Sequence, residues 1–224
     1  MIVLAIIISC LISYLLGSCN SAIITVRLFE HKDIRDYGSH NAGLTNTLRC
    51  FGKKCALFTL LGDLLKGVAA VLLSKFVCVL LGAADSIGAD NIVFMGYVAG
   101  LAAIFGHVFP LYYHFKGGKG VLVGVSVFLV IDWRTFLILI GIFALVLAVT
   151  KYVSVGSITG AACAPVVTFV TQYFSSMDLN YVILDTVLAA CMGIWIIFMH
   201  RSNIQRLRAG NENKFSFTKN KKEK

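Results

Sequence analysis

The chain has 224 residues, of which 58% are hydrophobic and only 14% are charged, and its formal net charge is +9. Soluble domains carry roughly a quarter charged residues, so this composition excludes an ordinary soluble protein and indicates an integral membrane protein. Apolar runs continue to residue 199. We therefore expect one membrane domain over 1–215 and a basic, disordered cytoplasmic tail over 216–224.

The apolar runs predict the membrane-spanning helices, since about twenty apolar residues cross a bilayer as a helix. The first run follows no basic segment, and we expect it to be retained as a helix. Asp132, Trp133 and Arg134 interrupt the run between residues 121 and 150, which favours two short helices over one helix that buries both charges. The predicted spans are 3–29, 56–82, 92–113, 121–131, 135–150, 153–174 and 181–199.

The basic residues indicate how the helices are oriented. They gather in the expected connections 30–55 and 114–120, at Lys151 and in the tail, whereas the linkers 83–91 and 175–180 have acidic residues and no basic one. Because cytoplasmic connections are rich in Lys and Arg, this pattern puts the N-terminus outside and the C-terminus in the cytoplasm. The predicted fold is an all-α polytopic membrane protein with seven transmembrane helices. The same rule explains the positive charge, so we expect no nucleic-acid partner.

Several common catalytic motifs are missing from the sequence. It has no G-x-S-x-G or H-E-x-x-H motif, and its 7 cysteines form no C-x-x-C pair, so neither a disulfide framework nor a metal site is expected. His31 and Asp36 fit the H-x-x-x-x-D pattern of acyltransferases that use soluble donors. A two-residue pattern in a charged loop arises easily by chance.

The first polar cluster is the stretch Tyr37–Leu48, YGSHNAGLTNTL, which Arg49 follows. Its glycines let the backbone approach a ligand, its hydroxyls and amides supply donors, and Arg49 adds a charge suited to phosphate. A loop of this kind that enters an apolar helix can bind an anion. Taken alone, the stretch is more simply explained as a solvated connecting loop, because short glycine motifs are weak evidence.

The second polar cluster combines the sequence GHVFP at 106–110 with FKGGKGV at 115–121. A double glycine with a lysine at the start of a helix is suited to anion binding. The cluster is not a Walker A loop, because Gly120 stands where Ser or Thr would hold magnesium. The alternative is a tight turn at the membrane surface whose lysine extends into water. For His107 we favour a packed, hydrogen-bonded histidine.

The third polar cluster runs from His200 to Glu212, at the end of the last predicted span. His200 and Asn203 share a helix face, which Arg206 extends. A basic cap that anchors the helix to anionic lipid is the alternative reading. Weaker candidates are Tyr152–Ser157 and the pair Asp63 and Lys66 inside a span. Such charges are usually functional, although a mutual ion pair that holds the bundle together would also explain them.

In this order and spacing, the three clusters resemble the PlsY family of bacterial glycerol-3-phosphate acyltransferases, which use acyl phosphate. The family pattern GSGNxGATN followed by Arg corresponds to residues 38–46 and Arg49, with His40 and Leu44 as departures. The patterns GHxFP and FxGGKGV, and HRxNIxRLxxGxE from His200 to Glu212, are intact. The resemblance extends from about residue 14 to residue 215.

The resemblance implies a seven-helix enzyme in the bacterial cytoplasmic membrane, with its active site at the cytoplasmic face. It would transfer a fatty acyl group from acyl phosphate to the 1-hydroxyl of glycerol 3-phosphate, giving lysophosphatidate and inorganic phosphate. The implied catalytic residues are Ser39, Arg49, Lys119, His200 and Asn203. The implied substrate-binding residues are Gly38, Asn41, Gly43, Thr45, Asn46, Gly117, Gly118, Ser157, Arg206 and Glu212.

The resemblance leaves the general base open between His200 and the phosphate of glycerol 3-phosphate, and we favour the substrate phosphate. No metal, no other cofactor and no covalent intermediate are expected, because an acyl phosphate is already activated. The expected partners are both substrates, the lipid bilayer and a soluble acyltransferase that forms the acyl phosphate. A small solute transporter and a non-catalytic membrane scaffold are the rival functions, although polar motifs at one surface fit a transporter poorly.

Overall fold

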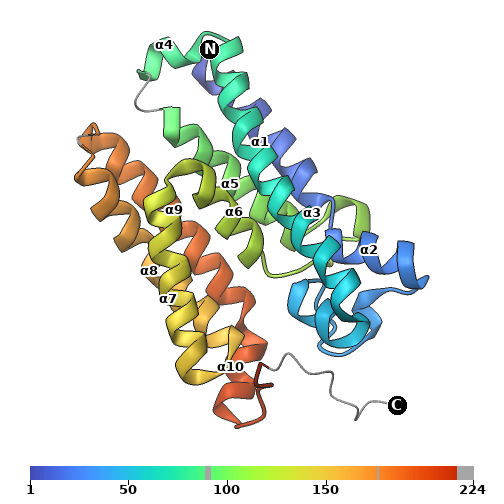
Figure 1. The fold of residues 1–224 in the computed structure, drawn as a ribbon. Coiled ribbons are helices and arrows are strands. Elements are labelled where there is room, and N and C mark those ends of the chain that lie inside the picture. The colour runs from blue at the N-terminus through green and yellow to red at the C-terminus, as the bar shows by residue number, and fades with distance from the viewer. Residues whose placement is uncertain (89–91, 176, 216–224) are drawn as a thin grey trace.

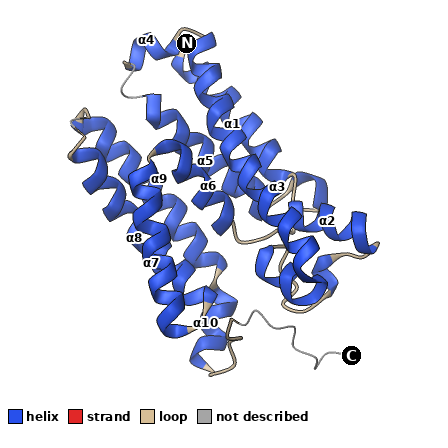
Figure 2. Ribbon diagram, viewed as in Figure 1, coloured by secondary structure: helices blue, strands red, loops and turns tan. Residues whose placement is uncertain are grey.

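A computed structural model describes residues 1–88, 92–175 and 177–215. Every regular element in these ranges is a helix (Figure 2). The tail 216–224, which the sequence predicts to be disordered, lies outside the described residues. In Figure 1 helices α5 and α6 lie between a group formed by α1 to α3 and a group formed by α7 to α9.

The first expected span, 3–29, is divided into two helices, α1 (Ile2–Ser18) and α2 (Ser21–Glu30). The break follows from Asn20, whose side chain accepts a hydrogen bond from the Ile23 N–H at 3.1 Å and so caps α2. Asparagine is a strong N-cap because its short side chain reaches the free N–H groups of the first turn. Its amide also donates to the carbonyl of Ala42 at 3.4 Å, which ties the break to the polar loop.

Helix α3 (Leu44–Leu80) has 37 residues and begins well before the expected span 56–82. The connection expected at 30–55 is therefore shorter: it holds the 3₁₀ turn η1 (Ile34–Asp36) and ends at Gly43, the N-cap of α3. At Gly52, φ is 81°, and the helix axis changes direction there. Such a value is open to glycine and strained for other residues. The kink separates the polar first turns of α3 from its membrane-spanning part.

Helices α4 (Ala83–Ile87) and α5 (Val93–Val108) follow, and the 3₁₀ turn η3 (Leu111–Tyr113) ends the segment that the sequence assigned to the span 92–113. Glycines bring α1 and α5 into close contact. A Cβ at Gly17 would overlap the carbonyl of Ala103, and one at Gly106 would overlap the carbonyl of Tyr14. Small residues at such contacts allow close backbone approach, which drives helix association in lipid.

Asp132 separates α6 (Val121–Ile131) from α7 (Trp133–Thr150). Its carboxylate accepts hydrogen bonds from the Arg134 N–H and guanidinium, both at 3.0 Å, and from the Thr135 hydroxyl at 3.1 Å. The charge is thereby satisfied at a helix start, where acidic groups are favourable. The remaining helices are α8 (Val153–Tyr173), α9 (Leu179–Met199) and α10 (Arg201–Arg208).

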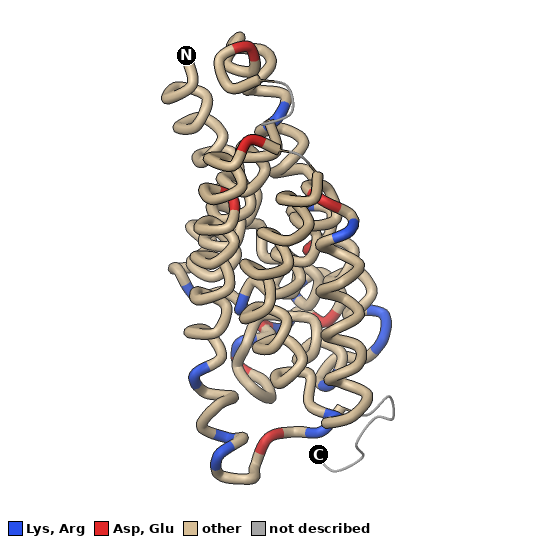
Figure 3. The backbone as a smooth tube through the Cα atoms, turned by 90° about the vertical axis from the view of Figure 1, so that its left-hand side faces the viewer, with Lys and Arg blue, Asp and Glu red and all other residues tan. Residues whose placement is uncertain are grey.

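Among the described residues, 6 helical segments are long and apolar enough to cross a membrane. These are Ile2–Glu30, Leu44–Leu80, Val93–Tyr113, Trp133–Thr150, Val153–Tyr173 and Leu179–Met199. The remaining predicted span, 121–131, corresponds to α6, which has 11 residues. That is about 16 Å of helix against a hydrocarbon core of about 30 Å. Figure 3 shows Lys and Arg gathered toward the end of the bundle opposite the N-terminus.

Candidate active site

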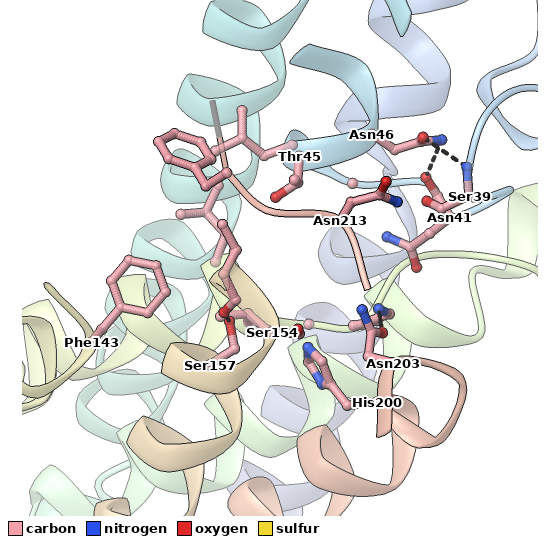
Figure 4. Close-up of a pocket in the computed structure, with 18 of the residues that line it drawn as sticks. Ser39, Asn41, Thr45, Asn46, Phe143, Ser154, Ser157, His200, Asn203 and Asn213 are labelled. Carbon is pink, nitrogen blue, oxygen red and sulfur yellow. Dashed lines mark hydrogen bonds between the residues drawn. The ribbon is translucent and has the colours of Figure 1, made fainter. Parts of the chain in front are cut away.

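A cavity of about 280 Å³ lies at the basic end of the bundle, where all three polar clusters of the sequence meet. Figure 4 shows Ser39, Asn41 and Asn46 on one side, His200 and Asn203 on another, and Ser154 and Ser157 at the start of α8. Of the sequence-predicted site residues, those that line the cavity are Ser39, Asn41, Gly43, Thr45, Asn46, Arg49, Lys119, Ser157, His200, Asn203, Arg206 and Glu212. The three that do not are Gly38, Gly117 and Gly118.

Asn46 organises the first loop. Its amide donates to the carbonyls of Tyr37 at 3.0 Å and Asn41 at 3.1 Å, and its oxygen accepts from the Ser39 N–H at 3.0 Å. The side chain is 2% exposed. These bonds satisfy a buried amide that would otherwise be costly. Asn46 therefore shapes the loop and has little capacity left for a ligand, although the sequence suggested a binding role.

Other polar groups of the first cluster remain available to a ligand. Within the described ranges, the side chains of Ser39, Asn41 and Thr45 have no hydrogen-bond partner, and the Arg49 guanidinium has no ion-pair partner. An unpaired guanidinium beside hydroxyl and amide groups can bind phosphate through two parallel hydrogen bonds. This side of the cavity is suited to a phosphate group.

Gly38 supports the first loop from outside the cavity. Its φ is 59°, and a Cβ there would lie 2.5 Å from the Asn46 oxygen and 2.6 Å from the Cys50 sulfur. Only glycine combines this backbone conformation with such close packing. Gly38 therefore fixes the position of the next residue, Ser39, at the cavity.

Gly117 and Gly118 hold the second loop against the end of α5. The Gly117 N–H donates to the Val108 carbonyl and the Gly118 N–H to the His107 carbonyl, both at 3.1 Å. A side chain at either glycine would overlap atoms of this region. The two glycines thus position the next residue, Lys119, at the cavity.

Lys119 points across the cavity and donates a hydrogen bond to the side-chain oxygen of Asn203. Burial and the nearby Arg206 lower the pKa of Lys119 to about 8, while Glu212 opposes the shift. A half-buried ammonium with so little compensating negative charge favours an anionic ligand. The second and third clusters therefore form a cationic side of the cavity.

His200 lies at the junction of α9 and α10 and is 3% exposed. Its Nδ1 lies 2.7 Å from the Ile196 carbonyl, and since a carbonyl only accepts, Nδ1 carries the proton. Burial and the positive charge of Lys119 lower the pKa of His200 to about 4. The ring is therefore neutral near pH 7, and its Nε2 can accept a hydrogen bond from a hydroxyl group.

Glu212 links two helices, α8 and α10. Its carboxylate accepts hydrogen bonds from Asn203 at 2.6 Å, Arg206 at 2.7 Å and Ser154 at 2.8 Å. Burial alone would raise the pKa of Glu212, but these three hydrogen bonds outweigh burial and hold the pKa below its usual range. Because its oxygens are used, Glu212 joins α8 to α10 and orients Asn203, whereas the sequence suggested a substrate contact.

The structure adds lining residues that the sequence did not single out. Ser154 lay within the weaker segment Tyr152–Ser157, and Asn213 and Phe215 follow directly after Glu212. The Phe215 N–H donates to the Lys151 carbonyl at 2.7 Å, which draws residues 211–215 over the cavity. Phe143 of α7 had no sequence signal, because one aromatic residue in an apolar span is ordinary. The alternative pair His31 and Asp36 is not part of the lining.

A second, apolar cavity of about 60 Å³ continues from the first between α6, α7, α8 and α9. Both cavities are lined by Val121, Val125, Ile140, Phe143 and Ser157. We call the second cavity the apolar slot. Residues that line the slot but not the first cavity include Gly160, Ala164 and Met192. A polar, cationic chamber that opens into an apolar slot can accommodate a molecule with an anionic head and a hydrocarbon chain.

The described residues contain no group of three His, Cys, Asp or Glu side chains that could hold a metal ion. The absence of a metal cofactor stays a prediction. What the site does offer is hydrogen-bond donors and cations, which stabilise negative charge without a metal.

Comparisons with known proteins show which family the chain resembles. A family model described as glycerol-3-phosphate acyltransferase matches residues 7–210. A glycerol-3-phosphate acyltransferase of Clostridioides difficile (strain 630) is 37% identical over 208 residues, covering 93% of this chain and 94% of the relative. Another, of Fusobacterium nucleatum subsp. nucleatum, is 38% identical over 208 residues, covering 92% and 96%.

The fold is also similar to that of a crystallised protein. The crystal structure of PlsY, an integral membrane glycerol 3-phosphate acyltransferase, in its glycerol 3-phosphate form has a TM-score of 0.75 and 30% identity, covering 94% of this chain and 96% of that one. Its lysophosphatidic acid form has a TM-score of 0.73 and 29% identity. The family model, the relatives and the fold agree over nearly the whole chain, which therefore belongs to the glycerol-3-phosphate acyltransferase family of the PlsY type, multi-pass membrane acyltransferases of phospholipid biosynthesis.

Proposed function

We propose that this enzyme uses acyl phosphate as its donor and acylates the 1-hydroxyl of glycerol 3-phosphate, releasing lysophosphatidate and inorganic phosphate. The observation that carries the proposal is the joined pair of cavities, in which donors and cations on two sides of one chamber meet an apolar slot. Both substrates carry phosphate and need two anion subsites, and the donor also needs room for its hydrocarbon chain.

The first loop is proposed to hold the donor's phosphate. Ser39, Asn41 and Thr45 have free polar groups there, and Gly43 is the N-cap of α3, so the first N–H groups of this helix face the same region. Helix N-termini favour anions because their N–H groups are unpaired and the helix dipole is positive there. The acyl chain then extends past Ser157 into the apolar slot.

Arg49, Lys119, Ser157, His200 and Asn203 are proposed to bind glycerol 3-phosphate. The cations neutralise its phosphate, His200 Nε2 accepts a hydrogen bond from the neighbouring 2-hydroxyl, and the reacting 1-hydroxyl donates its hydrogen bond to the phosphate. The hydroxyl oxygen attacks the acyl carbon, the bond from that carbon to the phosphate oxygen breaks, and phosphate leaves with the electron pair. The hydroxyl proton passes to a phosphate oxygen. No covalent enzyme intermediate is needed, because positioning and charge stabilisation suffice for an activated acyl group.

We infer that the glycerol 3-phosphate phosphate group is the base. With a pKa of about 4, His200 is a weak proton acceptor, whereas a phosphate monoester has its second pKa near 6. General bases are most effective when their pKa lies near the working pH. His200 then orients the glycerol through its other hydroxyl, and the substrate phosphate takes the proton of the reacting one.

We further propose seven membrane crossings, with the N-terminus outside and the site at the cytoplasmic face of a bacterial cytoplasmic membrane. The basic end of the bundle in Figure 3 supports this orientation through the positive-inside rule. At that face the site would meet glycerol 3-phosphate from the cytoplasm and acyl phosphate from a soluble acyltransferase. Residues 1–215 then act as one domain.

The test uses purified protein in lipid with palmitoyl phosphate and glycerol 3-phosphate, following lysophosphatidate and phosphate together. We expect both products in equal amounts, no effect of a chelator, and loss of turnover in Lys119→Ala. Activity with acyl-CoA but not with acyl phosphate would overturn the proposed donor. If folded protein is silent with both donors, transport of a small anion becomes the better explanation, and flux into vesicles would measure it.

A further inference from the structure

A buried charged cluster beneath the cavity has no role in the mechanism above. It consists of Asp63 and Lys66 on α3 and His107 on α5, whose exposed fractions are 1%, 7% and 3%. Asp63 and His107 also reach the cavity wall. Charges inside a membrane protein are expensive and therefore need an explanation.

The ion pair between Asp63 and Lys66 does not by itself explain the cluster. Lys66 Nζ lies 2.7 Å from the Asp63 carboxylate, but both residues belong to α3, so this pair joins no two helices. The other contacts of Lys66 leave the helix. Its ammonium lies 2.8 Å from His107 Nδ1 on α5 and donates to the Cys19 carbonyl at 3.1 Å, at the break between α1 and α2. Asp63 thus supports the charge of Lys66 and itself lies 3.7 Å from His107 Nδ1, whereas Lys66 makes the shorter contacts to both neighbouring segments.

The contact with His107 leads to the second loop. An ammonium has only donors, so Lys66 donates to Nδ1, and the ring proton of His107 is on Nε2. That Nε2 lies against Gly118: a Cβ at Gly118 would overlap His107 Nε2 and lie 2.5 Å from the Ala42 carbonyl. The Gly118 N–H is also bonded to the His107 carbonyl at 3.1 Å. His107 therefore fixes the residue directly before Lys119.

The contact with Cys19 leads to the first loop. The next residue, Asn20, caps α2 and donates to the Ala42 carbonyl at 3.4 Å. Ala42 is followed by Gly43, where α3 begins. Lys66 is therefore connected to both loops of the cavity. The imidazole ring of His107 connects it to the second loop, and the segment Cys19–Asn20 connects it to the first loop.

We propose that Lys66 is a positioning residue for phosphate binding, which holds His107 and the α1–α2 break so that the two anion-binding loops stay packed against each other at Gly118. The inference rests on the proposed function, because the phosphate is that of glycerol 3-phosphate. Without Lys66, Lys119 and the first loop lose their relative position while the helices remain.

The main test is the double variant Asp63→Asn/Lys66→Met, which removes both charges and leaves no unpaired carboxylate in the membrane. We expect it to fold, with Kd and KM for glycerol 3-phosphate each raised about tenfold, the effect of losing a hydrogen bond to a charged group, and with kcat much less affected. Binding is measured by calorimetry on protein in detergent, and folding by thermal unfolding. Ser74→Ala is the matched control, since it cuts another α3–α5 hydrogen bond, from Ser74 to the Met95 carbonyl at 2.9 Å.

A second pair of variants separates positioning from packing. His107→Gln keeps an acceptor for Lys66 and a donor toward Gly118, whereas His107→Leu has neither. We expect the glutamine variant to bind nearly as the wild type does and the leucine variant to match the double variant. The inference is overturned if the folded double variant binds glycerol 3-phosphate as tightly as the wild type does. It is also overturned if the glutamine and leucine variants bind glycerol 3-phosphate equally well. If the wild type itself neither binds nor acylates glycerol 3-phosphate, the proposed function fails and takes this inference with it.

Discussion

The imidazole of His200 is held by one hydrogen bond that decides what its other nitrogen can do. Since Nδ1 donates to Ile196, Nε2 is an acceptor, and a pKa of about 4 makes it a weak base. We therefore expect His200→Ala to raise KM for glycerol 3-phosphate about tenfold while kcat falls only a few-fold. Steady-state kinetics at saturating acyl phosphate measures both constants. A fall of kcat by several orders of magnitude would instead identify His200 as the base.

Deprotonation of Lys119 should lower the activity of the enzyme at alkaline pH. Burial first, and Arg206 second, lower its pKa to about 8, so the free enzyme holds the ammonium below that pH and loses it above. Because kcat/KM reports ionisations of the free enzyme, we expect kcat/KM for glycerol 3-phosphate to fall about tenfold per pH unit above that value. Lys119→Arg, whose side chain stays charged, should be slower but lack this fall. An unchanged alkaline fall in the arginine variant would assign it to another group.

At the scale of the element, α8 forms one wall of the apolar slot, and Gly160 marks its open middle. A Cβ at Gly160 meets no atom within 4 Å. We expect Gly160→Leu to fold at least as well as the wild type, because glycine weakens a helix by about 0.5–1 kcal/mol relative to alanine. The new side chain should fill the slot and lower turnover of palmitoyl phosphate much more than turnover of butyryl phosphate.

The control for that prediction is Gly141→Leu on α7. A Cβ there also meets nothing within 4 Å, yet Gly141 lines neither cavity. Its activity should not depend on acyl-chain length. Equal losses with long and short donors in Gly160→Leu would mean that the hydrocarbon chain does not enter the slot.

The bounds of a helix could be predicted from the sequence where an apolar run alone determines them. The apolar runs gave the membrane helices to within a few residues, except where capping chemistry prevails. Asn20 ends the first helix inside an apolar run, and Gly43 begins α3 at a stretch whose Thr and Asn residues resemble a loop. Composition could not show that the polar start of α3 is helical. It is helical because the side chain of Asn46 forms hydrogen bonds with the loop before the helix.

The motifs of the site were predictable, but not what each residue does. The sequence predicts Asn46 and Glu212 as substrate-binding residues, but it does not show that their hydrogen bonds hold the first loop and α10 in place. Such roles depend on partners that lie far away in the sequence, as Ser154 does from Glu212. Phe143 and the apolar slot emerge only when α7 and α8 pack together.

For the whole molecule, the orientation in the membrane can be measured with two exposed positions. Asp178 lies just before the start of α9. Arg208 is the last residue of α10, which follows the other end of α9. In a variant without native cysteines, we expect Asp178→Cys to react with an impermeant maleimide on intact cells and Arg208→Cys to react only after permeabilisation. The reverse pattern would place the site outside the cell.

The slot has a consequence for how the rate of the enzyme must be expressed. Its α7 wall is largely bare: within α7 only Thr135 and Leu139 are buried, and Ile140, which lines the slot, is 36% exposed. In a bilayer that wall faces the lipid. For a donor that enters there, the reaction rate would depend on the mole fraction of the donor in the leaflet. Adding inert lipid should therefore slow turnover even when the total amount of donor stays constant. Glycerol 3-phosphate would remain governed by its concentration in water, and the enzyme would obey two-dimensional kinetics for one substrate and three-dimensional kinetics for the other.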